Sequence, residues 1–360
     1  MKAQTERVAG DAGAAVEPGV AVEPGAAVEP GAVGPCAHHE HEVWRHRHIL
    51  DVDDFTIDEI ELVMATAAEM KEILSRPIKK VPTLRGTSVT IIFWEASTRT
   101  RVSFEVAAKN LSADVVNIAA QASSVTKGES LVDTIRTIEA LGADMIVMRH
   151  GTSGAPYLAA EHFSGHVLNG GDGWHAHPTQ ALLDLYTMRE HLPEGTVAGR
   201  KVVILGDVLH SRVARSNIWT LTKSGVDLWL CGPATLLRGF ERWAGATIPG
   251  SATFTVTSDI ERALEGADVV MALRIQKERQ ESGLLPPLRE YTARFALTHE
   301  RLALASPDAL VMHPGPMNEG LEIMPDVATG TQSVITDQVT NGVAVRMALL
   351  FLVSGVRDVE

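Results

Sequence analysis

The stretch SVTIIFWEASTRTRVSFEVAAKNL, residues 88–111, decides the fold. Its first part is an apolar, β-branched run that predicts a buried strand, and its second part carries apolar residues at helical spacing. Ser97 lies where a helix N-cap is expected, and the next three residues bring N–H groups, hydroxyls and a guanidinium to the first turn. Such a turn suits a phosphate. An ordinary capped helix with surface arginines is the alternative, and the remainder of the chain has to decide.

Composition indicates a globular protein, and its length is enough for two domains. The chain has 360 residues, 45% of them hydrophobic, and a net charge of −13. This acidic balance argues against nonspecific nucleic-acid binding, although arginines from distant segments can still form a positive pocket. Because no apolar run approaches about 18 residues and the start, MKAQTERVAGD, lacks an apolar leader, we expect a cytoplasmic protein that does not enter a membrane.

The first 45 residues differ from the rest. They contain AVEPG three times, a low-complexity pattern that cannot build a core, so we predict a disordered extension over residues 1–45. The spacing of the following histidines and cysteine fits no zinc site, and we predict no metal site there. These residues are Cys36, His38, His39, His41, His46 and His48.

Beyond His48, strands and helices alternate, which predicts parallel sheets covered by helices on both faces. A helix is expected over residues 56–74, and further strands at ADMIVMRH, HVLNGG, RKVVILGD, VDLWLCG, ADVVMALR and DALVMHPG. Polar motifs directly follow the strands: STRTR, RH, GDGWHAHPTQ, GDVLHSR, RIQKER and HPGP. Ligands of such folds bind beyond the carboxyl ends of the strands, so these motifs predict one composite site.

These motifs, in this order and together with SSVTKGES at residues 123–130, resemble the catalytic chains of the aspartate carbamoyltransferase family over about residues 48–358. The resemblance implies two similar α/β domains, each a parallel sheet flanked by helices. The expected boundaries are 46–182 for a carbamoyl phosphate domain, rejoined by a C-terminal helix within 335–360, and 183–334 for an aspartate domain. It also implies transfer of a carbamoyl group to aspartate in pyrimidine synthesis, without a metal or organic cofactor.

The family's carbamoyl phosphate residues can be matched one by one. The matching phosphate binders are Ser97, Thr98, Arg99 and Thr100. Thr100, Arg149 and His177 match the catalytic donors to the carbonyl oxygen, which would act as an oxyanion hole. Gln180 matches the residue that holds the carbamoyl NH₂ group.

The resemblance also assigns the second substrate and the assembly. The residues that match aspartate binders are Lys127, Arg212, Arg274 and Gln276. Pro314 and Gly315 match a turn whose backbone contacts the substrates. The family is built on a homotrimer, in which Ser123 and Lys127 would enter a neighbouring subunit's site. A regulatory chain or a dihydroorotase are candidate partners.

Some positions depart from the family pattern. Trp94 and Ala96 stand where Phe and Pro are usual, and Trp174 is bulkier than its usual counterpart, so it could narrow the cleft or fill an interface. The residues for which we expect structural roles are Arg101, His150, His175 and His210, and surface ion pairs remain an alternative for Lys277 and Arg279.

Two other functions are weighed. Ornithine carbamoyltransferases share STRTR but are expected to carry a Ser-Met-Gly loop and HCLP, where this chain has SGLLPPLREY and HPGP. A catalytically silent scaffold subunit is the alternative from another class, and the intact Thr100, Arg149 and His177 argue against it.

Overall fold

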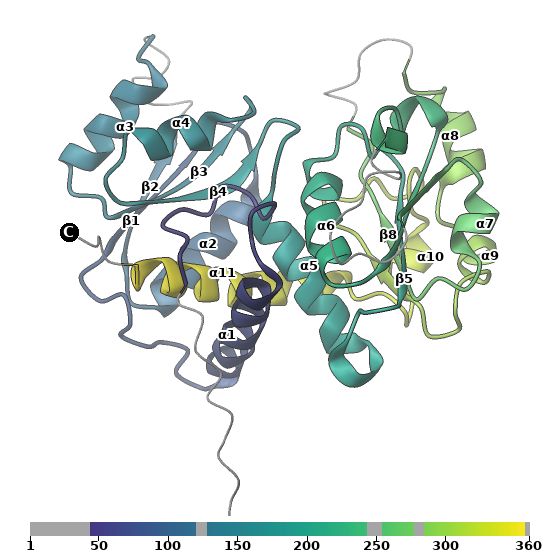
Figure 1. Ribbon diagram of the computed structural model, residues 1–360, viewed down its shortest axis with the longest axis horizontal. Coiled ribbons are helices and arrows are strands. Elements are labelled where there is room, and N and C mark those ends of the chain that lie inside the picture. The colour runs from purple at the N-terminus through teal and green to yellow at the C-terminus, as the bar shows by residue number, and fades with distance from the viewer. Residues whose placement is uncertain (1–43, 120–127, 243–253, 277–283, 357–360) are drawn as a thin grey trace, which may run out of the picture. The chain divides into compact units, whose positions relative to one another are not determined.

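The computed structural model describes residues 44–119, 128–242, 254–276 and 284–356 (Figure 1). The extension predicted over residues 1–45 lies outside these ranges except for its last two residues. Within the described ranges, no helix combines the length and the apolar character needed to cross a membrane.

The first sheet is parallel and has the strand order β2-β1-β3-β4. Its strands are β1 (Ser88–Phe93), β2 (Asp114–Ala119), β3 (Met145–His150) and β4 (His166–Asp172). The helices that cover it are α1 (Ile57–Ser75), α2 (Thr98–Asn110), α3 (Leu131–Ala140) and α4 (Ala155–Glu161). Ile91 belongs to the same core cluster as Phe104 of α2, whereas Ile92 belongs to a second cluster with Ile135 of α3, so β1 is buried on both faces. This burial explains its continuous apolar run.

The second sheet is also parallel, with the order β7-β6-β5-β8-β9. Its strands are β5 (Lys201–Leu205), β6 (Asp227–Cys231), β7 (Phe254–Thr257), β8 (Val269–Ala272) and β9 (Leu310–Met312). The helices α6 (Arg212–Lys223), α7 (Ile260–Leu264), α8 (Leu288–Phe295), α9 (His299–Leu302) and α10 (Pro325–Ala328) accompany it, with short 3₁₀ turns at Pro193–Gly195, Ala234–Leu236 and Phe240–Arg242. The predicted architecture of two parallel-sheet domains flanked by helices is confirmed.

Two long helices connect the sheets. Helix α5 (Pro178–His191) follows β4, and α11 (Ile335–Ser354) returns from the second sheet to pack on α1, α2 and α5 (Figure 1). Most residues of α11 beyond Asn341 are buried and apolar, as expected for a helix enclosed by other elements. One continuous hydrophobic core therefore contains Ile91 of the first sheet, Leu349 of α11 and Ile204 of the second sheet.

The register of the strands brings the polar motifs together. Phe93 at the end of β1 pairs with Arg149 of β3, and the N–H of Trp94 donates to the Arg149 carbonyl at 2.9 Å. An irregularity between Met148 and His150 shifts the register of β3 against β4. The STRTR turn and the end of β3 thus lie side by side, because parallel strands end at a common edge.

The enclosure of α11 leads to a stability prediction. Leu350 is 0% exposed and its neighbour Phe351 is 40% exposed. Because Leu350→Ala leaves a cavity in the shared core, it should lower the free energy of unfolding by about 2–5 kcal/mol. Phe351→Ala, the matched control, should lower it by about 1 kcal/mol or less. Urea denaturation measures both, and equal effects would contradict the placement of α11.

Candidate active site

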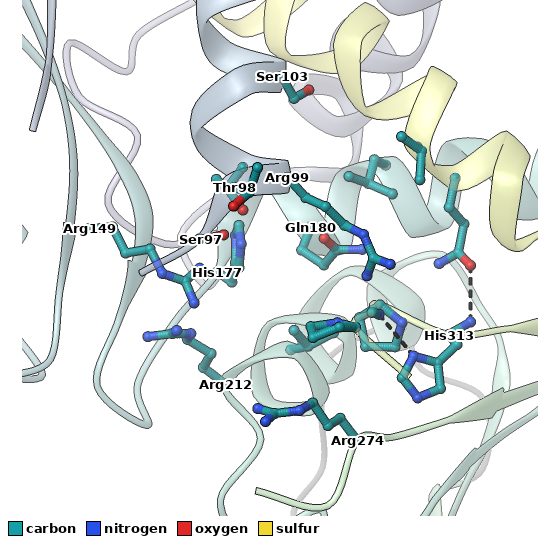
Figure 2. A pocket seen from close by; sticks show the side chains of 18 of the residues that line it. Ser97, Thr98, Arg99, Ser103, Arg149, His177, Gln180, Arg212, Arg274 and His313 are labelled. Atoms are coloured by element: carbon teal, nitrogen blue, oxygen red, sulfur yellow. Dashed lines mark hydrogen bonds between the residues drawn. The ribbon is translucent and has the colours of Figure 1, made fainter. Parts of the chain in front are cut away.

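A cavity of about 550 Å³ lies between the carboxyl ends of strands from both sheets (Figure 2). Every predicted site residue within the described ranges lines it: Ser97, Thr98, Arg99, Thr100, Arg149, His177, Gln180, Arg212, Arg274, Gln276, Pro314 and Gly315. Ser123 and Lys127 lie outside the described residues. The structure therefore joins motifs that are separated along the chain into one site.

Three helices begin at this cavity. Ser97 is the N-cap of α2, His177 that of α5 and Ser211 that of α6, and all three line the cavity. None of the three helices has an acidic residue in its first turn. The positive ends of the helix dipoles are therefore not neutralised locally, and they favour an anion in the cavity. The predicted position of Ser97 is confirmed, although its side chain makes no capping hydrogen bond.

The cavity contains five arginines, and Glu95 is the only carboxylate among its described lining residues. The Glu95 Oε2 atom accepts from Arg212 Nη2 at 2.8 Å and lies 3.5 Å from Arg149 Nε. Backbone carbonyls hold other donors, since Arg149 Nη1 donates to Gly170 at 3.1 Å and Arg212 Nη1 donates to Gly173 at 3.1 Å. These contacts orient two guanidinium groups across the cavity.

Two glycines let the backbone approach these arginines. Gly171 has a φ of +114°, and a Cβ added there would lie 3.0 Å from Arg212 Nε and 3.2 Å from Arg149 Nη1. Gly315 in HPGP has a φ of +63°, and its Cβ would lie 1.4 Å from Arg99 Nη1. A side chain at either position would strain the backbone and displace a guanidinium.

His177 is buried at the start of α5, with 4% of its surface exposed. Its backbone N–H donates to Ser216 Oγ at 3.0 Å, which ties it to α6. Burial, reinforced by the charges of Arg149 and Arg212, lowers the pKa of His177 well below 6.5. The imidazole is therefore neutral at physiological pH, and one of its nitrogens can donate a hydrogen bond without a full positive charge.

Several conspicuous side chains do not line the cavity. His175 pairs with Asp172 at 3.1 Å, and His210 pairs with Asp207 at 2.8 Å. The Trp174 ring contacts the His210 ring edge-on, with centroids 4.9 Å apart. Trp174 is 39% exposed and is absent from the cavity lining, so it does not narrow the cavity as the sequence suggested.

Sequence reasoning assigned no role to six polar residues that line the cavity: Glu95, Ser103, Ser211, His313, Gln338 and Arg346. Gln338 Oε1 accepts the His313 N–H at 3.0 Å, and the His313 ring accepts the Gly315 N–H at 2.8 Å, so both shape the HPGP turn. Arg346 Nη1 donates to Ser103 Oγ at 2.9 Å. An arginine within the apolar run VAVRMALLFLV was the available signal, because buried arginines need partners.

Metal ligands do not converge in the described part of the chain, where no three His, Cys, Asp or Glu side chains form a group able to hold an ion. The described lining residues of the cavity offer arginines, hydroxyls, amides and histidines. Such a set can bind anions and stabilise an oxyanion.

Two family models match the chain. The carbamoyl-P binding domain of aspartate/ornithine carbamoyltransferases matches residues 47–190, and the Asp/Orn binding domain matches residues 198–353. The aspartate carbamoyltransferase catalytic subunit of Roseiflexus sp. (strain RS-1) is 62% identical over 311 residues, covering 86% of this chain and 96% of the relative. The catalytic subunit of Dehalococcoides mccartyi (strain CBDB1) is 54% identical over 316 residues, covering 88% of this chain and 94% of the relative.

Solved structures agree with this match. Aspartate transcarbamoylase from Trypanosoma cruzi in complex with carbamoyl phosphate has a TM-score of 0.76 at 28% identity, covering 86% of this chain and 96% of its own. Ornithine carbamoyltransferase from Pyrococcus furiosus has a TM-score of 0.74 at 29% identity, covering 88% and 99%. The chain therefore belongs to the aspartate/ornithine carbamoyltransferase family.

Proposed function

We propose that this chain transfers the carbamoyl group of carbamoyl phosphate to the amine of L-aspartate, giving N-carbamoyl-L-aspartate and phosphate in pyrimidine biosynthesis. The observation that carries the proposal is a cavity with five arginines and three helix N-termini, in a chain 62% identical to an aspartate carbamoyltransferase catalytic subunit. The two substrates bring a phosphate and two carboxylates, which such a cavity suits.

The phosphate group would bind at the start of α2. Ser97, Thr98 and Thr100 offer hydroxyls and first-turn N–H groups, and Arg99 offers a planar set of donors. These donors stabilise the negative charge on phosphate, and this charge increases as the carbon–oxygen bond to the carbamoyl group breaks. The same residues therefore serve binding and departure of the leaving group.

The carbonyl oxygen would accept hydrogen bonds from Thr100, Arg149 and His177. Attack of the aspartate amine on the carbonyl carbon creates a tetrahedral intermediate, whose oxygen carries a negative charge. Because His177 is neutral and buried, it donates from a site with little water, where a hydrogen bond to an oxyanion is strong. The proton lost by the attacking amine can leave with the phosphate dianion.

The aspartate carboxylates would bind Arg212 and Arg274, with Gln276 beside them. Arg212 is 3% exposed, and its guanidinium is already oriented by Glu95 and the Gly173 carbonyl. Such preorganisation lowers the entropy cost of binding a carboxylate in a bidentate manner. Lys127, outside the described residues, would add a further positive charge from a neighbouring subunit.

Substrate choice tests the proposal directly. Ornithine carries a second amine and requires an acidic group, yet Glu95 is the sole carboxylate among the described lining residues and it already binds Arg212. We therefore expect phosphate release from carbamoyl phosphate to require L-aspartate, with L-ornithine at the level of the control without an acceptor. A phosphate-release assay with L-aspartate, with L-ornithine and without an acceptor decides this. Equal or greater turnover with ornithine would refute the substrate assignment.

The oxyanion role of His177 makes a second prediction. His177→Ala removes one donor to the intermediate, so kcat should fall by about tenfold to a thousandfold. His175→Ala, at a neighbouring histidine outside the cavity lining, serves as the control and should change kcat far less. If the kcat of His177→Ala equalled that of the wild type, His177 would have no part in the mechanism.

We further propose a cytoplasmic homotrimer in which Ser123 and Lys127 complete the neighbouring site, as the family resemblance implies. Lys127→Ala and Arg99→Ala should each be inactive alone. Randomly assembled trimers of the two should recover about a quarter of wild-type activity, because some sites then combine an intact Arg99 with an intact Lys127 from the next chain. Dissociating and reassembling the mixture measures this. Zero recovery, with trimers shown by light scattering, would rule out a shared site.

A further inference from the structure

Asp184 of α5 is a fully buried carboxylate behind the cavity wall, 0% exposed. Three side-chain amides donate to it. Its Oδ1 accepts from Gln180 Nε2 at 2.9 Å and from Gln338 Nε2 at 2.7 Å, and its Oδ2 accepts from Asn217 Nδ2 at 2.9 Å. These donors belong to α5, α11 and α6, so one carboxylate joins helices associated with both sheets.

An amide can present either its NH₂ group or its oxygen in nearly the same volume, and its hydrogen bonds select the orientation. An ionised carboxylate only accepts, so each of the three amides turns its NH₂ group towards Asp184. The oxygens then face elsewhere. Gln338 Oε1 accepts the His313 N–H at 3.0 Å, which anchors the HPGP turn.

Gln180 also turns its NH₂ group towards Asp184, but its oxygen has a different environment from that of Gln338. It lines the cavity, and no hydrogen bond to its oxygen is found within the described residues. With Nε2 held by Asp184, Oε1 is the end of the amide left to accept a hydrogen bond from a ligand. A carbamoyl NH₂ group is a donor and requires such an acceptor.

We propose that Asp184 is a positioning residue that selects the carbamoyl donor, because it holds the Gln180 amide with its oxygen towards the substrate NH₂ group. This inference rests on the proposed function. It gives the cavity a means to discriminate against acetyl phosphate, which has the same phosphate and carbonyl but a methyl group in place of NH₂. A methyl group would leave the Gln180 oxygen buried without a donor.

The charge on Asp184 is compensated within the protein. Burial raises the pKa of Asp184 to about 6, although the three amide hydrogen bonds and the charge of Arg346 lower it. The carboxylate is therefore still mainly ionised at neutral pH, as the proposed orientation of Gln180 requires.

The variant Asp184→Leu tests the inference, because it removes both carboxylate oxygens at a similar side-chain volume. The Gln180 Nε2 group then loses its acceptor, and the amide is no longer held with its oxygen towards the cavity. We expect the dissociation constant of carbamoyl phosphate to rise about tenfold, the effect of losing one hydrogen bond. The inhibition constant of acetyl phosphate, measured as a competitor of carbamoyl phosphate on the same preparation, should change less than about threefold.

The ratio of the dissociation constant of carbamoyl phosphate to the inhibition constant of acetyl phosphate shows whether Asp184 orients Gln180 or only stabilises the fold. Equal weakening of both ligands would mean that Asp184 only maintains the structure, and an unchanged ratio with unchanged affinities would mean that it does not orient Gln180. Either result overturns the inference while leaving the proposed function intact. Failure of the wild-type chain to turn over carbamoyl phosphate with aspartate would refute the proposed function itself.

Asn217→Ala is the matched control, since it removes a donor to the other oxygen of Asp184 and leaves Gln180 in place. Asn217→Ala should keep the preference for carbamoyl phosphate over acetyl phosphate. If this variant lost that preference, Asp184 would not be its specific determinant. If Asp184→Leu is insoluble, Asp184→Leu/Arg346→Met removes the buried charges together. That double variant should lose the preference that Arg346→Met alone retains, and equal ratios in the two would overturn the inference.

Discussion

Mutual repulsion among guanidinium groups is the constraint on which the architecture of the cavity depends. Five arginines line one cavity of about 550 Å³, and burial weakens the screening of their charges. The protein spreads this charge over several partners. Glu95 binds Arg212 and lies near Arg149, backbone carbonyls accept further donors, and Asp184 lies near enough to Arg346 for their charges to interact. The positive charge left in the cavity stabilises anions in a chain whose net charge is −13.

The fold meets this constraint by drawing the arginines from separate segments. Arg99 follows β1, Arg149 lies at the end of β3, and Arg212 begins α6. Parallel strands end at a common edge, so the segments converge without any one of them carrying a cluster of positive charge. The continuous core through α5, α6 and α11 then packs the two sheets against the same helices. Displacement of one of these helices would therefore move groups that belong to both proposed substrate subsites.

Local patterns were enough to predict the buried strands, the helix that begins after Ser97, and the position of each polar motif at a strand end. The edge strands β2 and β7 were not identified from the sequence. Their residues are mostly exposed or half-buried, so they lack the continuous apolar run of the central strands. Glu95 was visible in EASTRTR, but its partner Arg212 is 117 positions away. No local pattern specifies such a contact, and the same holds for Gln338 and Asp184, 154 positions apart.

Asp184 shows that the demands of folding and of the proposed chemistry are opposed. Burial raises its pKa from 3.8 to about 6, so the folded state prefers the protonated carboxyl. The stability that this preference contributes is fully present below pH 3.8 and is lost as the pH rises through about 6. At neutral pH the ionised form therefore costs on the order of 3 kcal/mol of stability. Orientation of the Gln180 oxygen requires that ionised form, because a protonated carboxyl can donate to the amide and permit the opposite orientation. An apolar residue at this position would relieve this cost, but it would leave the NH₂ groups of Gln180 and Gln338 without an acceptor. The orientations of these two amides therefore depend on a buried charge that lowers the stability of the folded state.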